Sequence, residues 1–241
     1  MKVRFDATGE VVVITGGAQG IGAALVTAVN AAGGTAVVFD VTAPVEGVEH
    51  VMVDVADRSA VEAAVAGVLE RHGRIDGLVA GAAVQPRSPV LEMDAAEWTR
   101  TLQVNLDGVV WACQAVVPHM VAQQSGSVVV FTSGMASTGF AGAAAYAASK
   151  AALVAFAKTL AVEVAGDRVR VNVVAPGVID TEQFRGANAS AEREHWQDTI
   201  GIGDPEDVVG PLLFLLSDAA AMTGSLLTRE RAFAKLTSFV E

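Results

Sequence analysis

The sequence predicts an α/β protein with one Rossmann-like, doubly wound parallel sheet, and three observations support this prediction. Short and almost wholly apolar runs alternate along the chain with longer helix-like segments. Such continuous apolar runs are typical of parallel strands that helices cover on both faces. A glycine-rich turn follows the first run, and right-handed crossovers would place a ligand crevice at the carboxyl ends of the strands.

Seven apolar runs are the expected strands. Runs this short and continuous fit strands that are buried on both faces, although a short run alone does not exclude a helix. The expected strands cover residues 11–14, 36–39, 51–53, 78–80, 128–131, 169–174 and 226–228.

The expected helices lie between these strands, and several carry start signals. Two have the spacing of a capping box, and a third has proline at the first helical position. In the helix expected around residues 111–123, Pro118 should end or bend the helix, because proline removes a backbone donor. The start signals are Ser59 with Glu62, Asp94 with Glu97, and Asp204 followed by Pro205.

Composition indicates one large domain and argues against several classes of partner. The 241 residues are 52% hydrophobic and 18% charged without a Pro-, Gly- or Ser-rich linker, so we expect residues 1–241 to form a single domain. A net charge of −11 without a basic stripe argues against nucleic acid and anionic membranes. No apolar stretch reaches membrane-spanning length and the first ten residues are charged, so we expect a cytoplasmic protein. The lone Cys113 allows no intrachain disulfide, and we assign no metal site.

The glycine-rich turn predicts a dinucleotide site. The segment TGGAQGIG, residues 15–22, stands between the first expected strand and a helical run over residues 23–32. Gly16, Gly20 and Gly22 would let the backbone turn tightly and approach a pyrophosphate, whose charge the helix N-terminus would meet. An ordinary loop is the alternative, but the position between a strand and a helix favours a dinucleotide.

A second motif combines a phenol, an amine and a hydroxyl. Tyr146, the only tyrosine, is followed four residues later by Lys150, and on a helix both side chains would share one face. A phenol is a poor base at neutral pH, so a nearby cation is needed to favour the phenolate. The four-residue spacing of Tyr146 and Lys150 alone is weak evidence for a catalytic site. Ser133 adds a hydroxyl at the carboxyl end of an expected strand, where the crevice would lie.

Together these motifs resemble the classical short-chain dehydrogenase/reductase family over about residues 5–227. The turn matches the family's Thr-Gly-x-x-x-Gly-Ile-Gly, and Ser133, Tyr146 and Lys150 have the family's order and spacing. Asn105, in Val-Asn-Leu-Asp-Gly, matches the asparagine through which members hold a water linked to the lysine. The resemblance therefore implies that Asn105, Ser133, Tyr146 and Lys150 form the catalytic set, although each residue alone also has a packing or surface interpretation.

The resemblance implies a nicotinamide cofactor, and Asp40 favours NAD. Asp40 ends the second expected strand, where a carboxylate can bind the ribose hydroxyls and repel a 2′-phosphate; a solvated aspartate is the alternative. The basic residue that NADP-using members carry near these positions is missing. Asp54 resembles the family's adenine contact, with helix capping as the alternative. The implied cofactor-binding set is Gly16, Gln19, Gly20, Ile21, Gly22, Asp40, Asp54, Val55, Tyr146, Lys150, Pro176, Gly177, Ile179 and Thr181.

The segment PGVIDT, residues 176–181, resembles the family's Pro-Gly-x-x-x-Thr. By that resemblance it covers the nicotinamide, with backbone groups of Ile179 on the carboxamide and a hydroxyl contact from Thr181; an ordinary turn is the alternative. Residues 178–203 lack a clear strand and are expected to form a substrate lid. A mostly apolar substrate pocket is expected from Val84, Gln85, Met135, Ser137, His195 and Trp196, with Arg185 and Arg193 as candidates for an acidic substrate unless both are solvated.

Three segments depart from the family's patterns. AGAA at 80–83 replaces Asn-Asn-Ala-Gly, residues 198–203 replace Pro-Leu-Gly-Arg-x-Gly, and RERA at 229–232 replaces Val-Asp-Gly-Gly. In the family, the helix expected over residues 145–165 makes a dimer contact and the last strand completes a homotetramer. Charges after that strand would be costly to bury unless they were paired across the interface. We therefore expect a homo-oligomer, and the dimer and the tetramer both stay open.

The leading hypothesis is an NAD-dependent oxidoreductase that interconverts a secondary alcohol and a ketone, with Tyr146 as the acid and base. A non-catalytic NAD-sensing or scaffold protein is the alternative, against which the presence of Tyr146 and Lys150 counts. An extended-type sugar epimerase or dehydratase normally needs a longer C-terminal substrate domain. The sequence leaves the particular alcohol or ketone open.

Overall fold

Seven parallel strands form the centre of the protein, which confirms the predicted doubly wound sheet. In the computed structural model, which describes residues 4–229, the strands lie in the order β3-β2-β1-β4-β5-β6-β7. The order reverses between β1 and β4, and such a switch point opens a crevice at the carboxyl ends of the strands. The strands are β1 (Val11–Thr15), β2 (Thr35–Asp40), β3 (Glu49–Met52), β4 (Gly77–Ala80), β5 (Gly126–Phe131), β6 (Val169–Ala175) and β7 (Leu226–Thr228).

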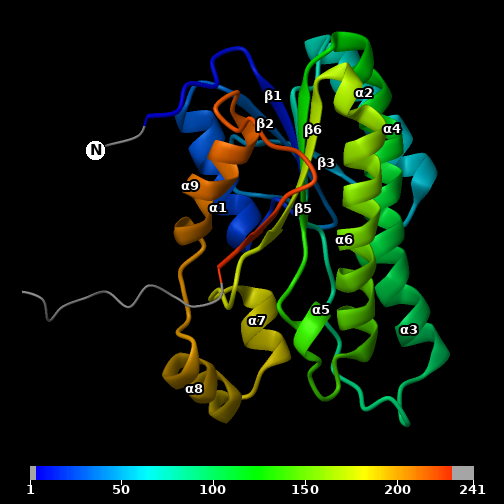
Figure 1. The fold of residues 1–241 in the computed structure, drawn as a ribbon, viewed down its shortest axis with the longest axis vertical. Helices are drawn as coiled ribbons and strands as arrows, with labels where there is room; N and C mark the ends of the chain where they lie inside the picture. Colours follow the sequence, from blue (N-terminus) through cyan, green and yellow to red (C-terminus); the bar gives the residue numbers. More distant parts are fainter. Residues whose placement is uncertain (1–3, 230–241) are drawn as a thin grey trace, which may run out of the picture.

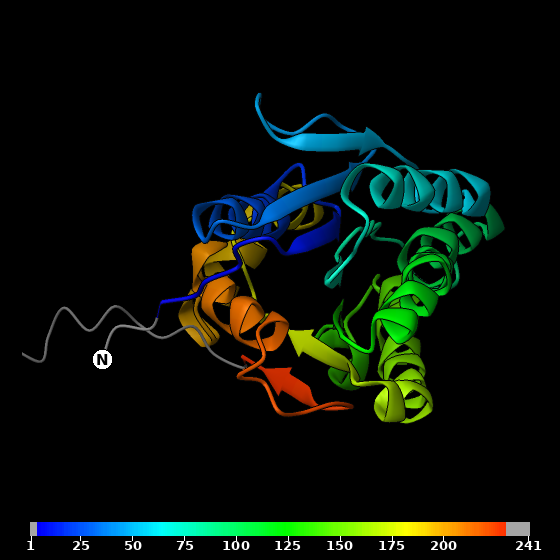
Figure 2. The same ribbon diagram turned by 90° about the horizontal axis from the view of Figure 1, so that it is seen from above.

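Helices cover both faces of this sheet (Figures 1 and 2). Because side chains alternate along a strand, Val12 and Ile14 of β1 join the core under α1 and α9, whereas Val11 and Val13 join the core on the opposite face. None of the helices in residues 4–229 has the length and apolarity to cross a membrane. The covering helices are α1 (Gly20–Ala31) and α9 (Glu206–Leu216) on one face, and α2 (Arg58–His72), α4 (Gly108–Gln123) and α6 (Ala144–Val164) on the other.

The predicted start signals are only partly correct. Asp94 caps α3 (Ala95–Leu102) by accepting the Glu97 N–H at 2.8 Å, as predicted. The Ser59 prediction is wrong, because α2 begins two residues earlier and its cap is Asp57, whose carboxylate accepts the Ala60 N–H at 3.1 Å. Ser59 instead donates its hydroxyl to Asp57 at 2.7 Å.

Pro118 does not end the helix in which it lies. α3 continues through a π-helical turn, η1 (Gln103–Asp107), into α4, which passes Pro118 and ends at Gln123. Proline removes one backbone hydrogen bond, but Val116, Val117 and Met120 are buried around it. Their packing holds the helix together across the missing bond.

The segment expected to be a lid contains two helices. α7 (Glu182–Ala187) has Thr181 as its N-cap, and α8 (Ser190–Thr199) follows after a short connection. An isolated parallel bridge joins Ile179 to Gly203, so the ends of the segment lie side by side. The remaining short elements are α5 (Met135–Thr138) and η2 (Ala165–Asp167).

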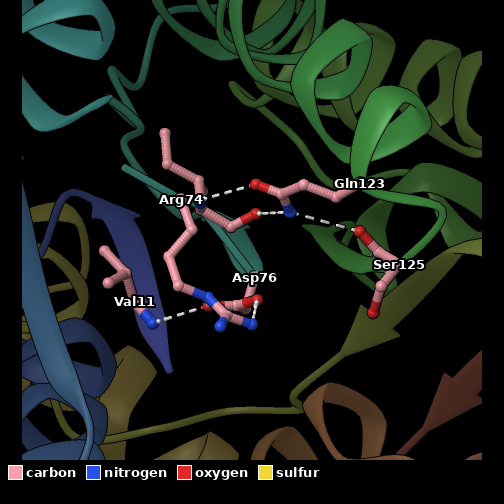
Figure 3. A network of polar contacts seen from close by, with 6 residues as sticks. Val11, Arg74, Asp76, Gln123 and Ser125 are labelled. Carbon is pink, nitrogen blue, oxygen red and sulfur yellow. Dashed lines mark hydrogen bonds and ion pairs between the residues drawn. The ribbon is translucent and has the colours of Figure 1, made fainter. Parts of the chain in front are cut away.

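A polar network joins the amino ends of β1, β4 and β5, on the side of the sheet opposite the predicted crevice (Figure 3). The Asp76 carboxylate accepts the Val11 N–H at 2.9 Å and two donors of Arg74 at 2.6 and 2.8 Å. The Gln123 amide bonds both backbone groups of Ile75 at 3.0 and 3.2 Å. The network therefore sets the relative positions of the central strands.

Replacing Asp76 with alanine should lower the free energy of unfolding by about 2 kcal/mol, because the part-buried Val11 N–H loses its acceptor and Arg74 loses its partner. Urea unfolding measures the change. The control Glu62→Ala removes an ion pair whose side chains are 56% and 52% exposed, and should cost less than about 0.5 kcal/mol. Equal effects of the two variants would contradict the bracing role.

Candidate active site

A cavity of about 1110 Å³ lies along the carboxyl ends of the strands. Its volume is slightly above the usual range for ligand sites, which is about 300 to 1,000 Å³. Every residue of the predicted cofactor-binding set lines it, and so does Ser133. Asn105 does not, because its side chain is buried behind the wall. One cavity therefore brings together residues that lie far apart in the sequence.

The glycine-rich turn has no room for side chains at two of its glycines. Gly16 has a φ of +72°, and a Cβ atom there would lie 2.7 Å from the Ala82 nitrogen. A Cβ atom on Gly22 would lie 2.2 Å from the Gly16 carbonyl oxygen. α1 begins within the turn, at Gly20, and no hydrogen bond from the Gln19 side chain caps it. The turn thus exposes the free N–H groups of a helix N-terminus to the cavity, an arrangement that suits a phosphate.

Asp40 is held rigidly at the end of β2. Its Oδ2 accepts the Ala18 N–H at 3.0 Å, and its Oδ1 accepts the backbone and hydroxyl donors of Thr42 at 3.1 and 3.0 Å. The bond to Ala18 ties the carboxylate to the glycine-rich turn. A negative charge therefore stands where the sequence predicts the adenosine ribose.

Asp54 has a partner that the sequence analysis missed. Its Oδ2 lies 2.8 Å from Nη2 of Arg100, and its Oδ1 accepts the Ala56 N–H at 3.0 Å. Asp54 does not cap α2, because Asp57 does. Arg100 also lines the cavity, so this end of the site contains an ion pair. Arg100 stands on α3 outside the start signal of that helix, and no sequence signal marks it.

The loop after β4 lacks the family's asparagines and is held by another group. Thr15, at the end of β1, accepts the Gly81 and Ala82 N–H groups on its hydroxyl oxygen at 3.1 and 3.2 Å. Thr15 is 2% exposed, so these bonds are shielded from water. The AGAA segment therefore keeps a fixed backbone beside the cavity despite the lost side-chain amides.

Tyr146 and Ser133 both line the cavity, and their side chains lie next to each other. Ser133 lies two residues after Phe131, the last residue of β5, and Tyr146 lies in the first turn of α6. Burial raises the pKa of the Tyr146 phenol, whereas a hydrogen bond with Ser133 and the positive charge of Arg87 act to lower it. Tyr146 thus keeps its proton at neutral pH in the unliganded protein, next to a second hydroxyl.

Lys150 lies one helical turn after Tyr146, on the same face of α6. Its Nζ donates to the Phe131 carbonyl at 3.1 Å and lies 5.7 Å from the centre of the Tyr146 ring. The side chain is 2% exposed, and burial lowers the pKa of the ammonium group to about 8. The lysine therefore places a cation near the phenol, as the spacing predicts.

Asn105 is buried behind the cavity wall and supports it through hydrogen bonds. It lies in the π-helical turn η1, where its Nδ2 donates to the Val84 carbonyl at 2.9 Å and to the Ser149 hydroxyl at 3.2 Å. Its Oδ1 accepts the Val84 N–H at 2.8 Å. These bonds tie the loop after β4 to α6. The contact to Lys150 through a water stays a prediction.

The segment after β6 closes one side of the cavity. Thr181 caps α7 by accepting the Phe184 N–H at 3.1 Å, and its methyl group lies against Gly20 of the glycine-rich turn. Ile179 is buried at the isolated bridge. The predicted nicotinamide contacts and the predicted phosphate turn are therefore neighbours.

The substrate end of the cavity is aromatic. Val84, Gln85, Met135, Ser137 and Trp196 line the cavity as expected, but His195 does not. The two arginines considered for an acidic substrate do not line it either, and Arg185 pairs with Asp180 at 2.9 Å. Among the lining residues that were missed, some lie in segments without a motif, including Phe140, Phe184 and Asn188.

The unusual segment after β7 is tied into its own chain. Arg229 is 21% exposed and its Nη2 lies 3.1 Å from Asp207 Oδ2, at the start of α9. It also packs over Gly203, where a Cβ atom would lie 2.3 Å from Nη2. The ion pair with Asp207 thus reduces the energetic cost of burying the Arg229 charge, and both partners belong to the same chain. Glu230 and Arg231 lie outside the described residues.

Comparison with known proteins agrees with this geometry. The sequence model of the short chain dehydrogenase family matches residues 10–192. The chain is 34% identical to the 3-oxoacyl-(acyl-carrier-protein) reductase FabG of Chlamydia pneumoniae, over 91% of this chain and 94% of that protein. It is 35% identical to the D-threitol dehydrogenase of Mycolicibacterium smegmatis, over 92% of each.

Two further proteins extend this comparison. The chain is 33% identical to the cis-4-hydroxycyclohexanecarboxylate dehydrogenase of Sinomonas cyclohexanicum, over 90% of this chain and 93% of that protein. The solved structure of the aldohexose dehydrogenase of Thermoplasma acidophilum in ligand-free form superposes with a TM-score of 0.86 at 28% identity, over 94% of this chain and 93% of that chain. The chain therefore belongs to the classical short-chain dehydrogenase/reductase family of oxidoreductases.

Proposed function

We propose that the protein is an NAD-dependent oxidoreductase that interconverts a secondary alcohol and a ketone, with Tyr146 as the acid and base. The observation that carries this proposal is the meeting of Ser133, Tyr146 and Lys150 in the cavity that also contains the glycine-rich turn. The turn fits a pyrophosphate because its glycines leave the space that side chains would fill. When bound, the nicotinamide accepts or supplies the hydride.

The side chains then have separate roles in proton transfer. Ser133 donates a hydrogen bond to the substrate oxygen, and Tyr146 gives its proton to that oxygen during ketone reduction. The raised phenol pKa keeps the proton available for this step. In alcohol oxidation the Lys150 cation favours the phenolate that takes the proton back. Asn105 holds the loop beside them, and a water held between Asn105 and Lys150 would relay the proton to solvent.

The names of the relatives suggest which substrates to test first. A panel of polyols, cyclic alcohols, hydroxy acids and 3-hydroxyacyl thioesters covers the chemistry that those names describe. Absorbance of NADH at saturating NAD reports turnover with each compound. Turnover of at least one secondary alcohol supports the proposal, and cofactor binding without any turnover would favour a sensor.

Asp40 should make the enzyme prefer NAD over NADP by at least about a hundredfold in kcat/KM, because a 2′-phosphate would meet a fixed carboxylate. Asp40→Ala should reduce this preference at least tenfold. The control Asp54→Ala alters the part of the cavity that is predicted to bind the adenine, and should change kcat/KM by the same factor for both cofactors. Equal or better use of NADP by the unaltered enzyme would refute the assignment.

We also propose that the protein is a homo-oligomer. On α6, Val162 is 81% exposed, and on the edge strand β7, Leu226 and Leu227 are 43% and 38% exposed. Exposed apolar residues on these two elements suit a dimer contact and a second, tetramer-forming contact. Light scattering after size exclusion should give a dimer or tetramer, and a monomer would refute the proposal. Leu227→Lys should leave a dimer if β7 makes the second contact.

A further inference from the structure

Arg229 brings together two of the segments in which the sequence departs from the family's patterns. It is the first residue of RERA, and its guanidinium lies on Gly203, the last residue of the segment 198–203. A Cβ atom on Gly203 would lie 2.7 Å from Nη1 and 2.8 Å from Cζ of Arg229. The family's pattern has an arginine at the position of Gly201, whereas the arginine beside this segment comes from position 229. The two departures therefore meet at one contact.

Arg229 is fixed through both its backbone and its side chain. Its N–H donates to the Ala175 carbonyl at 2.9 Å, next to the last residue pair of β6 and β7. Its Nη2 donates to Asp207 Oδ2 at 3.1 Å, and the same oxygen accepts the Asp204 N–H at 3.1 Å. Because Asp204 directly follows Gly203, Asp207 holds the guanidinium and the end of the expected lid together.

Gly203 is bonded in turn to the segment PGVIDT, residues 176–181. Its N–H donates to the Val178 carbonyl at 2.9 Å, and its carbonyl accepts the Asp180 N–H at 2.8 Å. Ile179 lies between these two residues and forms the isolated bridge to Gly203. A side chain that fixes Gly203 therefore also fixes the backbone that is predicted to cover the nicotinamide.

Arg229 contacts the PGVIDT segment directly as well. Gly177 has a φ of +80°, and a Cβ atom there would lie 2.5 Å from the Arg229 carbonyl oxygen. Both residues line the cavity. The Arg229 side chain is 21% exposed, so its ion pair with Asp207 is less screened by water than an exposed pair.

We propose that Arg229 is a positioning residue that holds the PGVIDT segment in the conformation that binds the nicotinamide end of the cofactor. This inference rests on the proposed oxidoreductase function. When a site binds in one conformation only, its affinity falls with the population of that conformation. Loss of the Arg229 side chain should therefore weaken binding of the nicotinamide. The glycine-rich turn and Asp40, which are predicted to bind the rest of the cofactor, should keep their contacts.

Two ligands that differ only in the nicotinamide test the proposal. NADH carries this ring, whereas ADP-ribose has the same adenosine, pyrophosphate and second ribose without it. In isothermal titration calorimetry, Arg229→Met should raise the Kd for NADH about tenfold and the Kd for ADP-ribose less than about twofold. A general loss of structure would raise both Kd values by the same factor.

Three further variants separate the ion pair from other effects. Asp207→Asn keeps an acceptor for the Asp204 N–H but removes the charge, and should raise the Kd for NADH at least about threefold. Added to Arg229→Met it should raise that Kd less than about twofold further, because both changes remove one interaction. Arg229→Lys keeps a cation for Asp207 and should bind NADH within about threefold of the original protein. Arg193→Met removes the same charge from α8, outside the cavity lining, and should leave both Kd values unchanged.

The outcomes distinguish this inference from the proposed function. Equal changes in the two Kd values in Arg229→Met, or no change in either, would overturn the inference and leave the oxidoreductase proposal standing. Circular dichroism checks that each variant is folded, and if Arg229→Met is not, a threefold rise for NADH alone in Asp207→Asn decides in the same way. An unaltered protein that binds neither NADH nor ADP-ribose would refute the proposed function itself.

Discussion

Tyr146→Phe is expected to lower kcat for ketone reduction by at least about a hundredfold. The substitution removes the hydroxyl that transfers the proton and leaves the aromatic ring, so the wall of the cavity is preserved. The Kd for NADH, measured by fluorescence titration, should change little. A loss in kcat with unchanged cofactor binding would identify an interaction made in the reaction step.

A control for this prediction removes a different hydroxyl from the same cavity. Ser137 is exposed and donates its hydroxyl to the Gly134 carbonyl at 3.1 Å. Ser137→Ala should therefore keep kcat within about threefold of the original enzyme. Near-full activity of Tyr146→Phe across the pH range would refute the catalytic assignment of Tyr146.

Gly22→Ala is expected to weaken NADH binding by at least about a hundredfold. A Cβ atom at position 22 would lie 2.2 Å from the Gly16 carbonyl oxygen and 2.8 Å from the Gly17 Cα, both of which are backbone atoms. The turn must open to accept it, and the N–H groups at the start of α1 then move away from the phosphate position. Fluorescence titration with NADH measures the change.

The matched control is a glycine in the interior of another helix. A Cβ atom on Gly210 of α9 meets nothing within 4 Å, so Gly210→Ala should bind NADH normally and unfold at the same or a higher temperature. Thermal unfolding of unliganded Gly22→Ala separates loss of binding from loss of the fold. Normal NADH binding by Gly22→Ala would contradict the placement of the pyrophosphate.

The sheet could be predicted because both of its faces are buried. Continuous burial makes β1, β4 and β5 apolar along their length, and this signal does not depend on the rest of the chain. β3 is an edge strand whose exposure alternates, so its apolar run at 51–53 did not match its bounds of Glu49–Met52. The predicted cofactor-binding residues and Ser133 meet in one cavity, because most of them stand at or just after the carboxyl ends of parallel strands.

Other features depend on contacts that the sequence does not reveal. Asp57 and Ser59 both suit a helix start, and local preference does not choose between them. The continuation of α4 past Pro118 depends on buried neighbours from distant segments. Arg87 has no motif around it, and its contacts with Phe140 and Asn188 form only when tertiary folding brings these residues together.

Transfer of deuterium from substrate to cofactor tests the central claim most directly. Secondary alcohols of the panel, deuterated at the carbinol carbon, are incubated with NAD and the protein, and the mass of the NADH formed is measured. The account predicts NADH that carries one deuterium, and no such product with Tyr146→Phe at the same time point. Protein that binds NADH but forms no deuterated NADH from any alcohol in the panel would contradict the account.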